Sequence, residues 1–152
     1  MTDTRFKDRL DALAQWYVTL TRQSVRHIGQ FYAPEVHFKD PFNDIRSIAA
    51  MIAVYEHMFD TTDNPHFIIH DRIVDGDQAF ITWVFEFRLK GKHYSIAGGT
   101  HLKFNAEGLV VLHRDYWDAA EELFQKLPVI GALIRWLRRL FETRIDLTAG
   151  RG

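Results

Sequence analysis

The hydrophobic periodicity of this chain changes once, near residue 66, and that change limits the fold more than any motif does. Before it, apolar residues recur about every 3.6 positions, which is the spacing of amphipathic helices. After it, apolar and polar residues alternate, as in strands with one buried face. The predicted strands lie near residues 66–74, 79–89, 93–104 and 109–118. Their connections are short and contain Gly76, Gly91 or Gly108, so the second half is predicted to form an antiparallel meander.

Three helices and one short strand are predicted before the change of period. The helices span residues 6–21, 24–32 and 48–59, and the strand spans residues 36–40. Ser24 is expected to cap the second helix and Pro34 to end it. Pro41 ends the strand, because proline cannot donate to a sheet ladder. This order predicts an α+β fold, in which a curved, mostly antiparallel sheet wraps around N-terminal helices as a cone open at one end.

Composition narrows the class of protein. The length of 152 residues fits one compact domain. With 19 Lys and Arg against 20 Asp and Glu, the chain has no general attraction to nucleic acid, so no nucleic-acid partner is expected. The absence of cysteine excludes disulfides and thiolate chemistry. His66 and His70 share a strand face but lack a third metal ligand, so no metal site is expected. No organic cofactor is expected either. No signal core or apolar run of about 18 residues occurs, which predicts a soluble, cytoplasmic protein.

One face of the predicted meander has the composition of a small-molecule pocket. If the turns close without bulges, Ile81 lies opposite Thr100. Thr100 then lies opposite His113, and Gly98 opposite Asp115. The face carries Ile81, Trp83, Phe85, Ile96, Gly98, Thr100, His113, Asp115 and Trp117. It is mostly apolar and aromatic with a few convergent polar groups, as pockets are. The pair Gly98-Gly99 predicts a bulge or a strong bend of the sheet.

The stretch HFKDPFND, residues 37–44, places Asp40 at a strand end directly before a proline. Phe38 and Phe42 would partly desolvate its carboxylate, which raises the pKa of Asp40 toward the range of a useful general base. Alternatively, Asp40 accepts a backbone hydrogen bond within the turn, as Asp before Pro often does. The residues alone leave both interpretations open.

A second candidate constellation lies on the last predicted strand. His113 and Asp115 are two positions apart, so their side chains share one face of the sheet. They could form a linked acid and base. Alternatively, His113 and Asp115 could be paired polar groups at a solvent-exposed entrance of the pocket.

Two stretches of the chain, FYAPEVHFKDPFNDI and LKFNAEGLVVLHRDYWD, resemble the nuclear transport factor 2-like superfamily. The order of elements agrees, and the resemblance is closest to ketosteroid isomerases and SnoaL-like polyketide cyclases, over residues 6–118. This resemblance implies that Asp40 is the general base of a proton transfer beside a carbonyl, with Asp115 as a rival base from the concave surface. It also implies a homodimer. The fold itself hosts many functions.

A base of this kind needs hydrogen-bond donors, because negative charge develops on the carbonyl oxygen. By ungapped alignment, the oxyanion tyrosine of the isomerases falls on Trp16. Tyr17 is rotated by about 100° around the helix and would serve only if the helix shifted. The second donor falls on Thr100, a weaker substitute, while Trp117 matches a pocket-wall tryptophan. These departures argue against steroid isomerase activity in the strict sense.

The C-terminal part is predicted to be a helical extension. The domain itself is predicted to cover residues 1–118. The extension covers residues 119–147, and a short tail covers residues 148–152. Pro128 suits the first turn of an amphipathic helix with arginines largely off its apolar stripe. The stripe could pack across the sheet, the pocket mouth or a second subunit. Alternatively, the basic helix could make weak contact with an anionic membrane surface.

Two classes of function follow from the sequence. One is a cofactor-independent isomerase or cyclase that transfers a proton on a small hydrophobic carbonyl compound. The other is a non-catalytic domain that binds a small hydrophobic ligand or mediates dimerisation. The candidate catalytic residues are Asp40, Asp115 and His113. The candidate substrate-binding residues are Trp16, Tyr17, Phe38, Ile81, Trp83, Phe85, Thr100 and Trp117.

Overall fold

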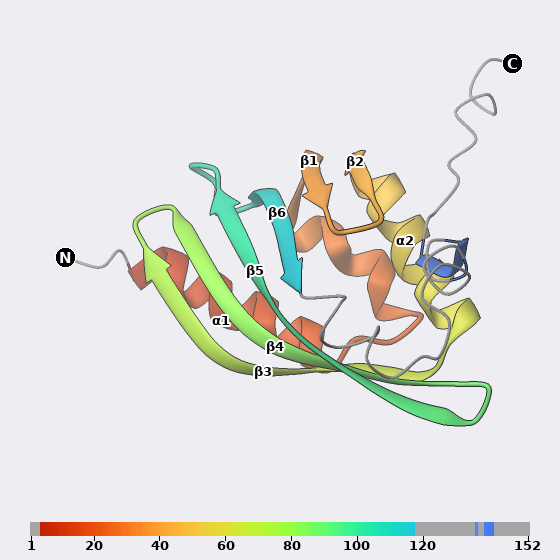
Figure 1. Ribbon diagram of the computed structural model, residues 1–152. Coiled ribbons are helices and arrows are strands. Elements are labelled where there is room, and N and C mark those ends of the chain that lie inside the picture. Colours follow the sequence, from red (N-terminus) through yellow and green to blue (C-terminus); the bar gives the residue numbers. More distant parts are fainter. Residues whose placement is uncertain (1–3, 118–135, 137–138, 142–152) are drawn as a thin grey trace, which may run out of the picture.

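A computed structural model of the protein describes residues 4–117, 136 and 139–141 (Figure 1). Within these residues the chain forms two α-helices, a 3₁₀ helix and six strands. In chain order these are α1 (Thr4–Val18), the 3₁₀ helix η1 (Ser24–Gln30), β1 (Tyr32–Lys39), β2 (Asp44–Arg46), α2 (Ile48–Thr61), β3 (Asp63–Asp75), β4 (Gln78–Leu89), β5 (Lys92–Phe104) and β6 (Val110–Trp117). No helix in this part of the chain is long and apolar enough to cross a lipid bilayer.

The strands form one sheet in the order β2-β1-β6-β5-β4-β3. Only β1 and β6 pair in parallel, and the other neighbours are antiparallel. Figure 1 shows the long strands bending around α1, with α2 beyond the short strands β1 and β2. The sheet stays open, and the predicted α+β cone is confirmed.

The two α-helices form where the apolar stripes predict them. In α1 the stripe through Leu10, Leu13 and Tyr17 is buried against the concave face of the sheet. In α2 the hydroxyl of Ser47 accepts a hydrogen bond from a backbone N–H of the first turn, which fixes the start of the helix. Met51 and Tyr55 then point into the core. The core therefore lies between these helices and the sheet.

The second predicted helix and the strand after it need correction. Ser24 does not cap an α-helix, because its hydroxyl accepts from the N–H of Thr21 at 2.8 Å and residues 24–30 wind as a 3₁₀ helix. Pro34 does not end a helix but lies inside β1, which begins at Tyr32. The β1–β6 ladder shifts register between Tyr32 and His37, so the proline, which has no N–H, is accommodated there. The predicted strand over residues 36–40 is thus only its second half.

Strand β2 is not predicted by the sequence reasoning. It pairs with β1 through His37 and Arg46, Phe38 and Ile45, and Lys39 and Asp44. Residues 40–43 therefore form the loop of a hairpin rather than an open connection. This hairpin holds the DPFN turn at the edge of the cone.

The predicted register is correct between β4 and β5 and wrong between β5 and β6. Ile81 pairs with Thr100, as expected. Thr100, however, pairs with Asp115 rather than His113, and Gly98 pairs with Trp117 rather than Asp115. The ladder shifts between Lys103 and Phe104, next to the Asn105 turn, so the turn does not close without an irregularity. The displacement is two residues, an even number, so every side chain keeps its predicted face.

The pair Gly98-Gly99 does not form a bulge. The β4–β5 ladder continues through both glycines without a register shift. A Cβ at Gly98 would lie 2.5 Å from Cη2 of Trp83, and one at Gly99 would lie 2.5 Å from Cζ of Phe80. The glycines leave room for two aromatic rings, one on each face of the sheet.

Most of the predicted C-terminal helix, residues 119–147, lies outside the described residues. Trp136, Leu140 and Phe141 are partly buried against the hydrophobic core, and Arg139 is exposed. For Leu140 and Phe141, which belong to the predicted apolar stripe, packing onto the domain is confirmed. Contact of the basic residues with a membrane surface stays a prediction.

Candidate active site

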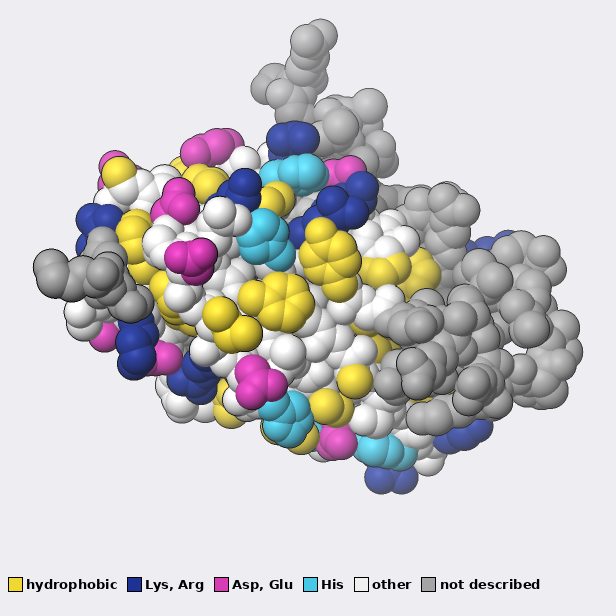
Figure 2. Space-filling view, turned by 60° about the vertical axis from the view of Figure 1, so that its left-hand side comes forward, with side chains coloured by type: hydrophobic (Ala, Val, Ile, Leu, Met, Phe, Trp, Pro, Cys, Tyr) yellow, Lys and Arg dark blue, Asp and Glu magenta, His cyan; other side chains and the backbone are white. Residues whose placement is uncertain are grey.

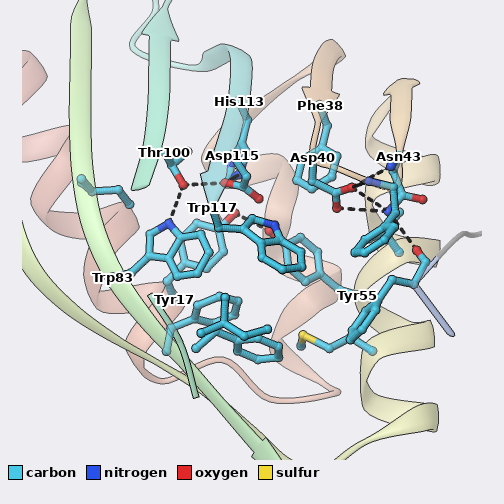
Figure 3. Close-up of a pocket in the computed structure, with 18 of the residues that line it drawn as sticks. Tyr17, Phe38, Asp40, Asn43, Tyr55, Trp83, Thr100, His113, Asp115 and Trp117 are labelled. Atoms are coloured by element: carbon cyan, nitrogen blue, oxygen red, sulfur yellow. Dashed lines mark hydrogen bonds and ion pairs between the residues drawn. The ribbon is translucent and has the colours of Figure 1, made fainter. Parts of the chain in front are cut away.

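A cavity opens between the concave face of the sheet, α1, α2 and the hairpin of β1 and β2 (Figure 3). The predicted wall residues that line it are Tyr17, Phe38, Ile81, Trp83, Phe85, Thr100 and Trp117. The candidate catalytic residues Asp40, His113 and Asp115 line it as well. The sequence-based choice of the concave face is therefore correct, and the exception is Trp16.

Asp40 is both a turn residue and a buried acid. Its Oδ1 accepts backbone hydrogen bonds from Phe42 at 2.7 Å and Asn43 at 2.6 Å. The side-chain amide of Asn43 donates to Oδ2 at 3.1 Å. Burial, and then repulsion from Asp115, raises the pKa of Asp40 from 3.8 to about 6, although these hydrogen bonds oppose the shift. The two interpretations of HFKDPFND are compatible, because the turn holds the carboxylate at the cavity wall.

The aromatic residue of α1 that lines the cavity is Tyr17, and Trp16, which the ungapped alignment places at the oxyanion position, does not line it. The indole of Trp16 donates to the carbonyl of Ser24 at 3.0 Å and packs against Phe31. Tyr17 belongs to the buried stripe of α1, whereas Trp16 is rotated by about 100° toward η1. No shift of the helix is needed to bring Tyr17 inward.

Three tyrosine hydroxyls meet beside the cavity, which Tyr17 and Tyr55 line and Tyr32 does not. Tyr17 Oη lies 2.6 Å from Tyr32 Oη and 2.7 Å from Tyr55 Oη. Burial is the main cause that raises the pKa of each of the three phenols well above its usual value. All three therefore stay protonated near neutral pH and can donate hydrogen bonds. Sequence reasoning missed Tyr32 and Tyr55 as site residues, although buried tyrosines require hydroxyl partners.

His113 and Asp115 extend this cluster across the sheet. Tyr32 Oη lies 2.8 Å from Nδ1 of His113, and Nε2 of His113 lies 2.8 Å from Oδ1 of Asp115. The Thr100 hydroxyl donates to the same Oδ1 at 2.5 Å, and the Trp83 indole donates to Thr100 at 2.8 Å. His113 is only 3% exposed, which contradicts a position at a wet pocket mouth. The predicted pairing of His113 with Asp115 is confirmed.

The comparisons with known proteins agree with this architecture. A family model described as a SnoaL-like domain matches residues 13–113. The chain belongs to the SnoaL-like family. Its fold is also similar to that of NTF2-like proteins, in agreement with the sequence resemblance. Comparison with curated protein sequences gives no significant match.

Solved structures similar to this SnoaL-like chain are described in different terms. A protein of ketosteroid isomerase-like fold from Catenulispora acidiphila, in complex with trimethylamine, is 20% identical, with 79% of this chain and 93% of that one covered and a TM-score of 0.62. A putative SnoaL-like polyketide cyclase from Jannaschia is 14% identical, with 78% and 88% covered and a TM-score of 0.63. An LEH-like epoxide hydrolase from M. tuberculosis is 15% identical, with 88% and 96% covered and a TM-score of 0.65. At these identities the similarity is one of fold.

The C-terminal segment completes the outer rim of the SnoaL-like cavity. Phe141 stacks on Phe42 with ring centroids 5.5 Å apart, and its carbonyl accepts from the Asn43 amide at 2.9 Å. Asn43 thereby connects Asp40 to this segment. Sequence reasoning missed Asn43 and Phe141 because their contact spans 98 positions and no local pattern indicates it.

His57 on α2 adds a further polar atom to the lining. Its Nε2 is buried without a hydrogen-bond partner, the only such side-chain nitrogen or oxygen in the described part of the chain. A buried unpaired nitrogen costs stability and is a ready contact for a bound molecule. The lining of the SnoaL-like cavity is thus mostly apolar and includes carboxylates, phenols and the histidines His57 and His113.

Proposed function

We propose that the protein is an isomerase or cyclase that transfers a proton on a small hydrophobic carbonyl compound, without a cofactor. One observation carries the proposal: the carboxylate of Asp40 and the buried phenol of Tyr17 line the same apolar cavity. A base and an oxyanion donor at one site are the two groups that proton abstraction beside a carbonyl requires.

Asp40 is suited to act as the base. Its pKa of about 6 makes the carboxylate a stronger base than an exposed aspartate, while most of it remains ionised at neutral pH. It would take a proton from the carbon beside the carbonyl, leaving an enolate, and return that proton to a different carbon. The backbone N–H groups of Phe42 and Asn43 keep the carboxylate in place for both transfers.

Tyr17 is suited to stabilise the enolate oxygen. A protonated phenol in a cavity with little water gives a strong hydrogen bond to a developing anion. Tyr32 and Tyr55 hold the Tyr17 hydroxyl in position from two sides. Trp83, Phe85 and Trp117 supply flat aromatic walls, which favour a flat hydrophobic substrate.

Asp115 is the second candidate for the base. Its Oδ1 is engaged by both His113 and Thr100, so only Oδ2 would face a substrate. Asp40→Asn and Asp115→Asn separate the candidates. We expect the first to abolish proton abstraction and the second to reduce it while leaving it measurable.

Deuterium exchange tests the proposal without knowledge of the product. Hydrophobic ketones that raise the melting temperature of the protein would be incubated with it in D₂O, and the protons beside the carbonyl would be followed by NMR. We expect at least one ligand to exchange these protons faster than in buffer, and Asp40→Asn to remove the acceleration. Stable binding of ketones without any accelerated exchange would contradict the proposal.

A non-catalytic binding or dimerisation domain is the alternative function. It is favoured by an apolar strip on the outer face of the sheet, where Ile73, Phe80 and Tyr116 are 60%, 36% and 48% exposed. Ile73 pairs with Phe80, the Phe80 ring covers Gly99, and Gly99 pairs with Tyr116. Figure 2 shows hydrophobic side chains gathered among charged ones on the face turned forward.

Oligomeric state distinguishes this alternative. We propose that the outer strip pairs with that of a second copy, and expect a dimer in light scattering after size exclusion. Phe80→Asp should shift the protein toward monomer if this face is the contact. A protein that is monomeric at all concentrations would exclude dimerisation as its function.

A further inference from the structure

A continuous chain of hydrogen bonds runs through the site from Trp83 to Tyr55. It passes from Trp83 through Thr100, Asp115, His113, Tyr32 and Tyr17 to Tyr55. Figure 3 labels six of its seven members, from Trp83 on the sheet to Tyr55 on α2; Tyr32 lies behind the lining. Each hydroxyl in the chain has one proton, so the direction of one bond constrains the direction of the next.

The donor and the acceptor of each hydrogen bond are fixed at the Trp83 end of the chain. An indole N–H can only donate, so Thr100 accepts from Trp83 and gives its own proton to Oδ1 of Asp115. With Asp115 ionised, Oδ1 accepts from His113 as well, and Nε2 of His113 must carry a hydrogen. The remaining variable is whether Nδ1 of His113 is bare or protonated.

With Nδ1 bare, Tyr17 has no proton to give to a ligand. Tyr32 then donates to Nδ1, and Tyr17 must donate to Tyr32, because two oxygens 2.6 Å apart need a hydrogen between them. Tyr55 in turn donates to Tyr17. Every hydroxyl proton of the cluster is used inside the protein.

With Nδ1 protonated, the phenol bonds reverse. His113 donates to Tyr32, Tyr32 can then donate to Tyr17, and Tyr55 can keep its donation to Tyr17. The oxygen of Tyr17 accepts both bonds, and its own proton is free for an oxygen atom in the cavity. We propose that His113 is a positioning residue, whose protonation turns the Tyr32 hydroxyl and releases the Tyr17 proton for an anionic ligand oxygen.

The surroundings of His113 favour this coupling. Asp115 faces it along β6, and the phenols of Tyr17 and Tyr32 face it from α1 and β1. The Phe38 ring packs on the imidazole with centroids 4.7 Å apart, while Leu102 on β5 is apolar. Among the residues that the structure describes, Asp115 is thus the one acidic group in hydrogen-bond contact with the ring. Binding of an oxygen anion at Tyr17 should therefore take up one proton at His113.

The inference rests on the proposed role of Tyr17, and 4-nitrophenolate serves as the probe because it carries an oxygen anion on a flat ring. All measurements use an Asp40→Asn background, in which the amide stands in for the protonated acid and Asp40 itself takes up no proton. Affinity is read from the visible absorbance of the phenolate. Protons taken up are counted by calorimetry in buffers that differ in ionisation enthalpy, at about pH 8, where an ordinary histidine is neutral.

We expect about one proton to be taken up for each phenolate bound. His113→Gln should reduce the uptake to about zero and weaken binding about tenfold, the value of one hydrogen bond. Tyr32→Phe, which keeps both Tyr17 and His113 but cuts the chain between them, should have the same two effects and serves if His113→Gln does not fold. His101→Gln is the matched control, because His101 is half-exposed and bonds only Gln78, and it should change neither quantity.

The outcomes separate the two proposals. If Tyr17→Phe weakens phenolate binding but His113→Gln and Tyr32→Phe keep both the affinity and the proton uptake, the role of His113 is wrong and that of Tyr17 stands. If Tyr17→Phe leaves binding unchanged, or the parent protein does not bind phenolate, the donor role of Tyr17 fails and this inference fails with it.

Discussion

The raised pKa of Asp40 makes a specific prediction about stability. From 3.8 to about 6, the pKa difference corresponds to about 3 kcal/mol, since each pKa unit is worth about 1.36 kcal/mol. The folded protein holds the proton more tightly than the unfolded chain does. As far as Asp40 is concerned, stability is therefore highest well below pH 4. It falls most steeply between about pH 4 and pH 6 and levels off about one pH unit above that. Asp40→Asn removes this loss because the amide does not titrate.

The assay is urea unfolding of the parent and Asp40→Asn proteins at a series of pH values. The free energy of unfolding of Asp40→Asn minus that of the parent should increase by about 2 kcal/mol between pH 4 and pH 6, the larger part of the total of about 3 kcal/mol. Hydrogen bonds weakened by the amide lower the difference equally at every pH, so they do not affect the slope. A flat difference, or one that decreases over this interval, would refute the burial argument.

Asp44 provides a control with the opposite sign. It is exposed, and its hydrogen bond to His37 lowers the pKa of its carboxyl group. Its contribution to stability is present above its ordinary pKa and is lost as the pH falls. Asp44→Asn minus parent should therefore decrease slightly with rising pH, the reverse of the Asp40 result.

Three further substitutions test the packing around the site, each by chemical unfolding at neutral pH. Gly98→Ala should destabilise the protein by about 1–3 kcal/mol, because the new Cβ would clash with the Trp83 ring. Gly29→Ala is the control and should change little, because its Cβ would meet Cδ1 of Ile48 at 4.0 Å, an ordinary contact distance. Ser47→Ala should cost about 1 kcal/mol through loss of the helix cap. His57→Leu should stabilise the protein by about 1 kcal/mol, because it removes the unpaired buried nitrogen, and a destabilised variant would show that His57 packs through its other atoms.

The assignment of Tyr17 shows which kind of sequence reasoning was reliable. The apolar stripe of the first helix already includes Tyr17 at a buried position, and burial follows from the helical period. The ungapped alignment places Trp16 at the oxyanion position, because it assumes one spacing between the helix and the DPFN turn. The 3₁₀ helix and the long β1 lie between them, and no local pattern predicts their lengths. Of the two residues, Tyr17 lines the cavity and Trp16 does not.

The sequence by itself determined the α+β class, the meander, and the face of each strand that borders the cavity. It did so because side-chain direction depends on a local period of 2 or 3.6, and the period survives a register error of two residues. It also determined that Asp40 sits in a turn between aromatic residues. Only the tertiary structure decided that Tyr17, Tyr32 and Tyr55 meet, that His113 connects them to Asp115, and that Phe141 closes over Asn43. These contacts join elements far apart in the chain, and their partners are fixed by core packing and ladder irregularities, which no local pattern encodes.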